Sequence, residues 1–187
     1  MQVIFNCIFY FVPIPLFNGF VMLGYTTVFT MLPVFCLLLD RDINPMAAFE
    51  YPQLYKTLQD GRDLNLKTFL AWVFKSIFQG LIIMVLTFSL FDNNYYDIIT
   101  VSFSALVVAE ILNVYSELNR ITIVTVLFTL GTLIFYWVSV YFISDWLDAK
   151  TIDVNYGIYI VIIAVICWLP FWGLKKYSMI TNPDDYQ

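Results

Sequence analysis

The sequence predicts an all-α protein, a polytopic bundle of about six transmembrane helices in which the first helix is truncated. Of its 187 residues, 61% are hydrophobic and only 12% are charged. Soluble domains are closer to half apolar and a quarter charged, and the mean hydropathy of +0.80 is also that of a membrane protein. In addition, apolar segments near the roughly 20 residues needed to cross a bilayer recur along the chain.

Six segments are candidates for these helices. Four are clearly long and apolar enough to span a bilayer: Phe20–Leu39, Phe69–Phe91, Ile121–Ile143 and Tyr156–Leu174. A fifth, Tyr96–Tyr115, is long enough but carries Glu110 and Asn113. The sixth, Met1–Leu16, is short and contains two prolines near its end, so it resembles the second half of a helix.

The connections are short except for Asp40–Lys67, which we expect to be a cytoplasmic loop. Within it, Pro45–Leu58 has apolar residues at helical spacing, which favours a short helix in the membrane interface. The chain has no repeat and no low-complexity linker, so residues 1–187 are predicted to form one membrane domain.

The distribution of basic residues predicts the orientation. If Asp40–Lys67 is cytoplasmic, seven basic residues share that side: Arg41, Lys56, Arg62, Lys67, Arg120, Lys175 and Lys176. The opposite side then has only Lys150, and Lys75 lies within a helix. Cytoplasmic loops carry the excess of Lys and Arg, so the C-terminus is predicted to be cytoplasmic.

The composition also excludes several functions. The chain has no histidine, and its three cysteines (Cys7, Cys36 and Cys167) lie in apolar runs at unrelated spacings. We therefore expect no catalytic residue, no metal site and no disulfide framework. Nucleic acid is not an expected partner either, because the nine Lys and Arg residues form no basic stripe.

Charged and amide side chains inside the membrane need an explanation, because each is costly there. Lys75 and Glu110 lie at a similar predicted depth on neighbouring antiparallel helices, which predicts an ion pair; alternatively, Lys75 extends to the interface. Glu110, Asn113 and Glu117 share one helical face, which we expect to point into the bundle. This face either lines a translocation path or forms interhelical hydrogen bonds.

The helix Phe20–Leu39 contains Thr26, Thr27, Thr30 and Pro33. Proline removes a backbone hydrogen bond, and nearby hydroxyls can bond the freed carbonyls. A broken, hydroxyl-rich helix is typical of a polar route through a membrane, although it can also be a simple kink.

Two stretches resemble a known family. Leu16–Asp42, LFNGFVMLGYTTVFTMLPVFCLLLDRD, resembles the sixth membrane helix of type IV P-type ATPases, the phospholipid flippases. Tyr51–Trp72, YPQLYKTLQDGRDLNLKTFLAW, resembles the following cytoplasmic loop and the start of the seventh helix. Within the family the chain is most similar to the branch thought to work without an accessory subunit. The later helices match the family in order and spacing.

The resemblance implies that Met1–Leu16 ends the fifth helix and that the chain finishes with the tenth. It implies phospholipid, the bilayer and the remaining ATPase domains as partners, and a Golgi or endosomal membrane as the location. The family's ATP and Mg are bound by other domains, and its phosphorylated DKTG motif does not occur here, so the chain alone is expected to be inactive. Many flippases have asparagine where Thr26 stands, which suggests a headgroup contact at Thr26 or Thr27. The alternative is a stand-alone membrane scaffold or passive carrier derived from such a pump.

Overall fold

A computed structural model describes residues 1–11, 13–39, 66–91, 95–118, 122–142 and 154–181. The elements of this part are all helical: α1 (Gln2–Ile8), α2 (Gly19–Gly24), η1 (Tyr25–Phe29), α3 (Met31–Leu39), α6 (Leu66–Leu90), α7 (Tyr95–Glu117), α8 (Ile123–Phe142) and α10 (Val154–Thr181). Among the described residues, four helices are long and apolar enough to cross a membrane, namely α6, α7, α8 and α10. The predicted all-α transmembrane bundle is thus confirmed.

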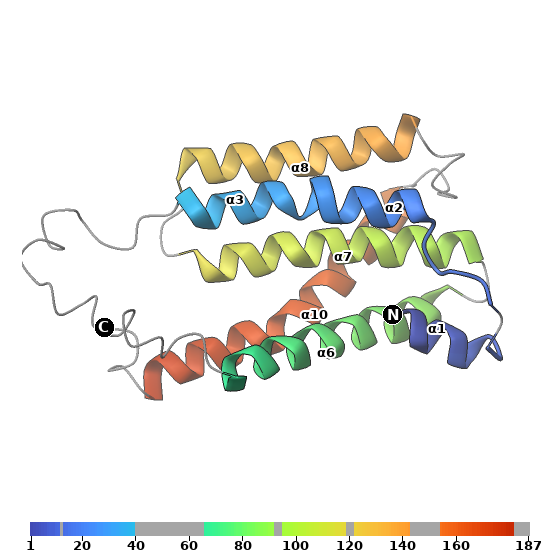
Figure 1. The fold of residues 1–187 in the computed structure, drawn as a ribbon, viewed down its shortest axis with the longest axis horizontal. Coiled ribbons are helices and arrows are strands. Elements are labelled where there is room, and N and C mark those ends of the chain that lie inside the picture. Colours follow the sequence, from blue (N-terminus) through green and yellow to red (C-terminus); the bar gives the residue numbers. More distant parts are fainter. Residues whose placement is uncertain (12, 40–65, 92–94, 119–121, 143–153, 182–187) are drawn as a thin grey trace, which may run out of the picture.

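The helices form a layered bundle around α7 (Figure 1). Along one side of α7 lies the line of α2, η1 and α3, with α8 packed on α3; α6 lies along the other side, and α10 crosses behind α7 at an angle and contacts both α7 and α6. Successive long helices alternate in direction, so the C-terminal ends of α3, α7 and α10 meet the N-terminal ends of α6 and α8 at one end of the bundle. This basic end, which carries Lys67, Lys175 and Lys176, is the one that the sequence predicts to be cytoplasmic.

Helix α7 is central because its side chains are small or hydroxylated. Ser102, Ser104, Ala105 and Ala109 are all buried, and small residues allow helices to approach closely inside a membrane. In the most apolar stretch of 18 residues in α7, 67% of the residues are buried. The corresponding share in the other three spanning helices is 22–28%. Those helices therefore present most of their large apolar side chains outward, as lipid contact requires, whereas α7 is enclosed by protein.

The first helix is shorter than the predicted Met1–Leu16, because α1 ends at Ile8. Tyr10 and Phe11 have φ angles of 54° and 57°, which an L-residue cannot continue as a right-handed helix. The chain beyond them is fastened by Gln2, whose side chain donates to the Ile14 carbonyl at 3.1 Å and accepts from the Leu16 N–H at 2.6 Å. The helix therefore ends before its prolines, at a point that hydropathy does not show.

The last helix is longer than the predicted Tyr156–Leu174. Helix α10 continues to Thr181 and includes Lys175 and Lys176, although it contains Pro170. Lys176 lies over the Trp172 ring, 5.0 Å from its centroid. An aromatic ring beside a basic residue is typical of a membrane interface, so the helix extends beyond its apolar part. The predicted interfacial helix Pro45–Leu58 lies outside the described residues.

Candidate functional site

The predicted helix Phe20–Leu39 is interrupted by a wide π-helical turn, η1. Val21, Tyr25, Phe29 and Pro33 are spaced four residues apart. We call these four residues the apolar stripe. In a continuous α-helix, residues four apart differ by about 40° in direction around the helix axis, so the stripe would turn by about 120° from Val21 to Pro33. A π-helical turn absorbs one extra residue, about 100°, and so keeps the stripe facing α7 and α8. Accordingly Val21, Phe29 and Pro33 are buried and Tyr25 is half-buried.

Threonine hydroxyls bond the carbonyls around this turn. Thr30 donates its backbone N–H to the Tyr25 carbonyl at 3.1 Å, the bond that defines the wide turn, and its hydroxyl bonds the same oxygen at 2.9 Å. Thr27 donates to the Leu23 carbonyl at 2.7 Å, and Thr26 to the same oxygen at 3.0 Å. The break therefore lies one turn before Pro33, the residue that signals it in the sequence.

A groove of about 820 Å³ lies beside this helix, between α1, residues 13–17, α2, η1 and α7. Its polar lining comes from Gln2, Asn6, Tyr25 and Thr26, and its apolar lining includes Phe103 and Leu106 of α7. Of the four predicted pathway residues, Thr26 lines this groove, whereas Thr27, Thr30 and Pro33 do not.

Lys75, which the sequence predicts to pair with Glu110, has its ion-pair contact with Glu117. Lys75 Nζ lies 3.9 Å from Glu117 and 4.4 Å from the centroid of the Trp72 ring. Trp72 and Glu117 are both nearer the basic end of their helices than the predicted pair. A long lysine side chain extends along its helix toward the hydrated interface, which is why Lys75 meets the carboxylate about two turns closer to that end.

Glu110 instead accepts a hydrogen bond from the Tyr25 hydroxyl at 3.1 Å. Glu110 therefore joins α7 to the π-helical turn, whereas Lys75 joins α6 to α7.

Glu117 is the centre of a charge cluster that joins three helices. It lies at the end of α7, between Lys75 of α6 and Lys175 of α10. Lys175 Nζ donates to Glu117 at 2.7 Å and to the Ser116 carbonyl at 2.6 Å. The cluster therefore fastens α6, α7 and α10 together at the basic end.

Asn113 pairs with Gln79, a residue that the sequence analysis did not single out. Each side-chain amide donates to the oxygen of the other at 3.1 Å, and both residues are buried. This reciprocal pair satisfies one donor and one acceptor of each amide between α6 and α7. An amide in the middle of an apolar helix is the signal that could have identified Gln79.

Hydroxyl groups also join α7 to α8, through residues that were not among the predicted polar contacts. Ser104 shares a hydrogen bond with Tyr136, and Tyr115 shares one with Thr129 at 2.9 Å. Thr125, Thr129, Thr132 and Tyr136 follow one another at spacings of four, three and four. This spacing is typical of a seam between two helices, so the pattern itself could have predicted a polar face on α8.

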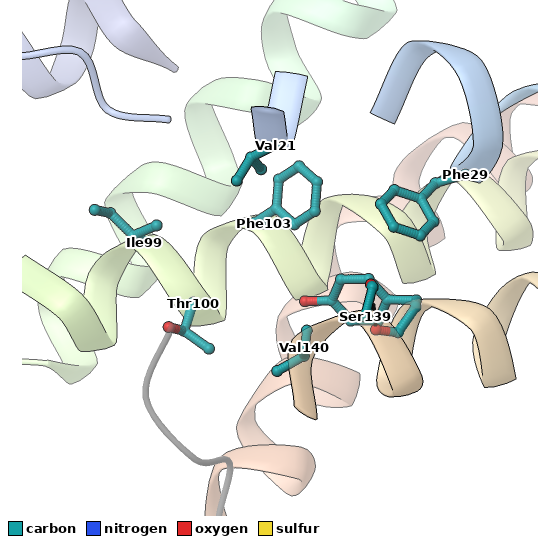
Figure 2. Close-up of a pocket in the computed structure, with 8 residues that line it drawn as sticks. Val21, Phe29, Ile99, Thr100, Phe103, Ser139 and Val140 are labelled. Carbon is teal, nitrogen blue, oxygen red and sulfur yellow. Dashed lines mark hydrogen bonds between the residues drawn. The ribbon is translucent and has the colours of Figure 1, made fainter. Parts of the chain in front are cut away.

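A small cavity of about 20 Å³ lies between the stripe and this seam. Figure 2 shows Val21, Phe29 and Phe103 around it, with Ser139 and Val140 of α8 on another side. Its volume is close to that of a single water molecule. The packing at the centre of the site is therefore not complete.

We expect Tyr136→Phe to destabilise the chain by about 0.6–1.5 kcal/mol. The substitution keeps the buried ring but removes the hydroxyl that bonds Ser104, and such interhelical bonds contribute about that much in membranes. Thermal unfolding in detergent micelles measures the change, with Tyr177→Phe as the control because Tyr177 is 69% exposed. Equal effects of the two substitutions would contradict the expectation.

Comparison with known proteins agrees with this architecture. The family model described as phospholipid-translocating P-type ATPase C-terminal matches residues 1–184. The chain is 38% identical over 187 residues to the probable phospholipid-transporting ATPase IIB of Danio rerio, covering 100% of this chain and 17% of that protein. It is 37% identical over 192 residues to the phospholipid-transporting ATPase NEO1 of Saccharomyces cerevisiae, covering 99% of this chain and 16% of that protein.

A third relative is the probable phospholipid-transporting ATPase tat-5 of Caenorhabditis elegans, 36% identical over 188 residues, with 100% of this chain and 17% of that protein covered. The chain thus spans about a sixth of the length of the curated relatives that it matches. Since the family model covers nearly all of it, the chain belongs to the C-terminal family of phospholipid-translocating P-type ATPases.

Proposed function

We propose that this chain is the membrane-spanning C-terminal part of a phospholipid-translocating P-type ATPase and supports phospholipid flipping across an intracellular membrane. The observation that carries the proposal is the interrupted, threonine-rich helix α2–η1–α3 with a groove beside it, in a chain of this family. ATP and Mg would act in domains outside these helices. In the described residues, no three His, Cys, Asp or Glu side chains are grouped as metal ligands. The chain alone would not be active.

The proposed lipid pathway follows Thr26, Thr27, Thr30 and Pro33. Thr26 is the strongest of these, because it lines the groove and its hydroxyl can still accept a hydrogen bond from a headgroup. Thr27, Thr30 and Pro33 would act by keeping the helix interrupted, since the two hydroxyls bond carbonyls of their own helix. Lys75, Glu110, Asn113 and Glu117 would hold the surrounding helices in place through the contacts described above.

We further propose that the C-terminus is cytoplasmic and that the membrane is that of the Golgi or endosomes. The basic end of the bundle supports this orientation. An epitope tag placed after Gln187 should be cleaved by protease added to intact organelles, because it would face the cytoplasm. A tag protected until detergent is added would reverse the orientation.

The alternative, a stand-alone scaffold or passive carrier, is tested by the size of the natural protein. An antibody against residues 175–187 should detect a band several times larger than 21.8 kDa in source cells, because the relatives are about six times as long. A band at 21.8 kDa alone would contradict the proposed function and favour the alternative.

A further inference from the structure

We propose that Glu110 is a positioning residue for the lipid groove. The hydrogen bond between Tyr25 and Glu110, called here the latch, would fix the rotation of the interrupted helix and so hold Thr26 toward the groove. The transport consequence of the latch rests on the proposed function, whereas its structural consequence does not.

The latch connects the π-helical turn to the central helix. The Tyr25 hydroxyl donates to Glu110 Oε1 at 3.1 Å, and the Tyr25 ring packs edge-on against Phe103 of α7 at a centroid distance of 6.0 Å. Phe103 and Glu110 are seven residues apart, two turns of α7, so they present one face to Tyr25. The hydroxyls of Thr26, Thr27 and Thr30, by contrast, bond carbonyls of their own helix.

A π-helical turn can change its register, which is why it needs an anchor. The turn contains one more residue than an α-helical turn, and exchanging the bond from Thr30 to the Tyr25 carbonyl for one to the Thr26 carbonyl would remove it locally. The helix on one side would then rotate by about 100° relative to the other. A cavity of about 20 Å³ lies beside Phe29 and Val21, so the packing against the turn is not complete.

The rotation would determine which side chains of the interrupted helix line the groove. Tyr25 and Thr26 are adjacent and both line the groove, so a rotation of about 100° would turn Thr26 away from it. Glu110 does not line the groove. Its effect on a bound lipid would therefore pass through Tyr25.

An acidic residue at this depth also needs a reason. A carboxylate within a transmembrane helix is costly, and Lys75, its predicted partner, contacts Glu117 instead. The hydrogen bond from Tyr25 on the neighbouring helix gives the Glu110 carboxylate a polar partner. The charge cluster at the basic end is centred on Glu117 and does not explain Glu110.

The transport test compares three substitutions in the full-length ATPase that contains this segment. Tyr25→Phe and Glu110→Leu remove the latch and should each raise the lipid concentration for half-maximal flipping about fivefold or more, with a smaller change in the maximal rate. Glu110→Gln keeps an acceptor oxygen and should restore nearly normal values. The double variant Tyr25→Phe/Glu110→Leu should be no worse than either single one. Additive effects, or an unchanged lipid requirement in Glu110→Leu, would overturn the proposal.

A second test does not depend on transport. In the full-length protein with its native cysteines replaced, Cys7, Cys36 and Cys167 among them, Thr26→Cys is labelled with a small thiol reagent, and Ile134→Cys on the outer face of α8 is the control. Adding Glu110→Leu should change the labelling rate at position 26 several-fold and leave position 134 unchanged, while Glu110→Gln should change neither. Equal labelling of position 26 with and without Glu110→Leu would overturn the latch. If the wild-type pump moves no lipid but the labelling changes, the latch stands and the proposed function fails.

Discussion

Glu117→Leu should lower the thermal unfolding midpoint of the chain in detergent micelles by roughly 4–12 °C. The substitution leaves Lys75 and Lys175 beside each other without the carboxylate that both contact. Hydrogen bonds to charged groups contribute about 1.5–3 kcal/mol, and breaking a fully buried ion pair costs about 3–5 kcal/mol. The side chains of Glu117 and Lys175 are 30% and 26% exposed, so we expect about 2–3 kcal/mol. For a chain of this length, 1 kcal/mol corresponds to roughly 2–4 °C.

Two adjacent lysines provide the matched control. Lys175→Met removes the bonds to Glu117 and to the Ser116 carbonyl, whereas Lys176→Met removes the contact with the Trp172 ring. We expect the first to be clearly more destabilising than the second. If Glu117→Leu has no effect, or if the two lysine substitutions are equal, the cluster does not join the three helices.

The second large effect is expected at the buried amide pair. Gln79→Met or Asn113→Leu leaves the other amide with a donor and an acceptor unpaired between α6 and α7. An unsatisfied buried polar group costs about 1–3 kcal/mol, whereas replacing both partners by apolar groups of similar shape is nearly neutral. The double variant should therefore be more stable than either single variant. Unfolding midpoints of the four proteins measure this coupling, and additive losses would show that the amides act independently.

Hydropathy predicted most of the bundle, because crossing a bilayer requires long apolar helices whatever their packing. The starts of α6 and α7 differ from the predicted starts by three residues and one residue. The helix ends that differed more are set by local effects. Helix α1 ends at Ile8, just before two residues with positive φ, and α10 continues through a basic, aromatic turn that a hydropathy limit excludes.

Which polar residues meet could be predicted only in part. The spacing of Glu110, Asn113 and Glu117 predicts that they share one face of α7, and each contacts a neighbouring helix, but the spacing could not give their partners. Partners depend on how neighbouring helices are rotated and on how far a flexible side chain extends, and neither quantity is periodic in one sequence. The extension of Lys75 toward Glu117 is an example.

The position of the apolar residues around the π-helical turn, by contrast, is a sequence signal that was present but was not used in the prediction. The presence of Pro33 predicted a break, whereas the constant spacing of Val21, Tyr25, Phe29 and Pro33 indicates that one extra residue must be absorbed along the helix, which the structure does at Tyr25–Phe29. That spacing also explains why Tyr25 points to Glu110. The sequence signal for the π-helical turn and for the contact between Tyr25 and Glu110 therefore lies in the apolar stripe and not in the threonines.

The most direct measurement is ATP-dependent phospholipid flipping by the purified full-length protein in proteoliposomes, followed with fluorescent lipids that a membrane-impermeant reductant quenches. We predict that the full-length protein moves lipid between leaflets when ATP and Mg are added, and that the 187-residue chain in the same vesicles does not. A folded full-length protein that moves no tested phospholipid, or a chain that equilibrates lipid without ATP, would contradict the assignment of these helices to a phospholipid pump.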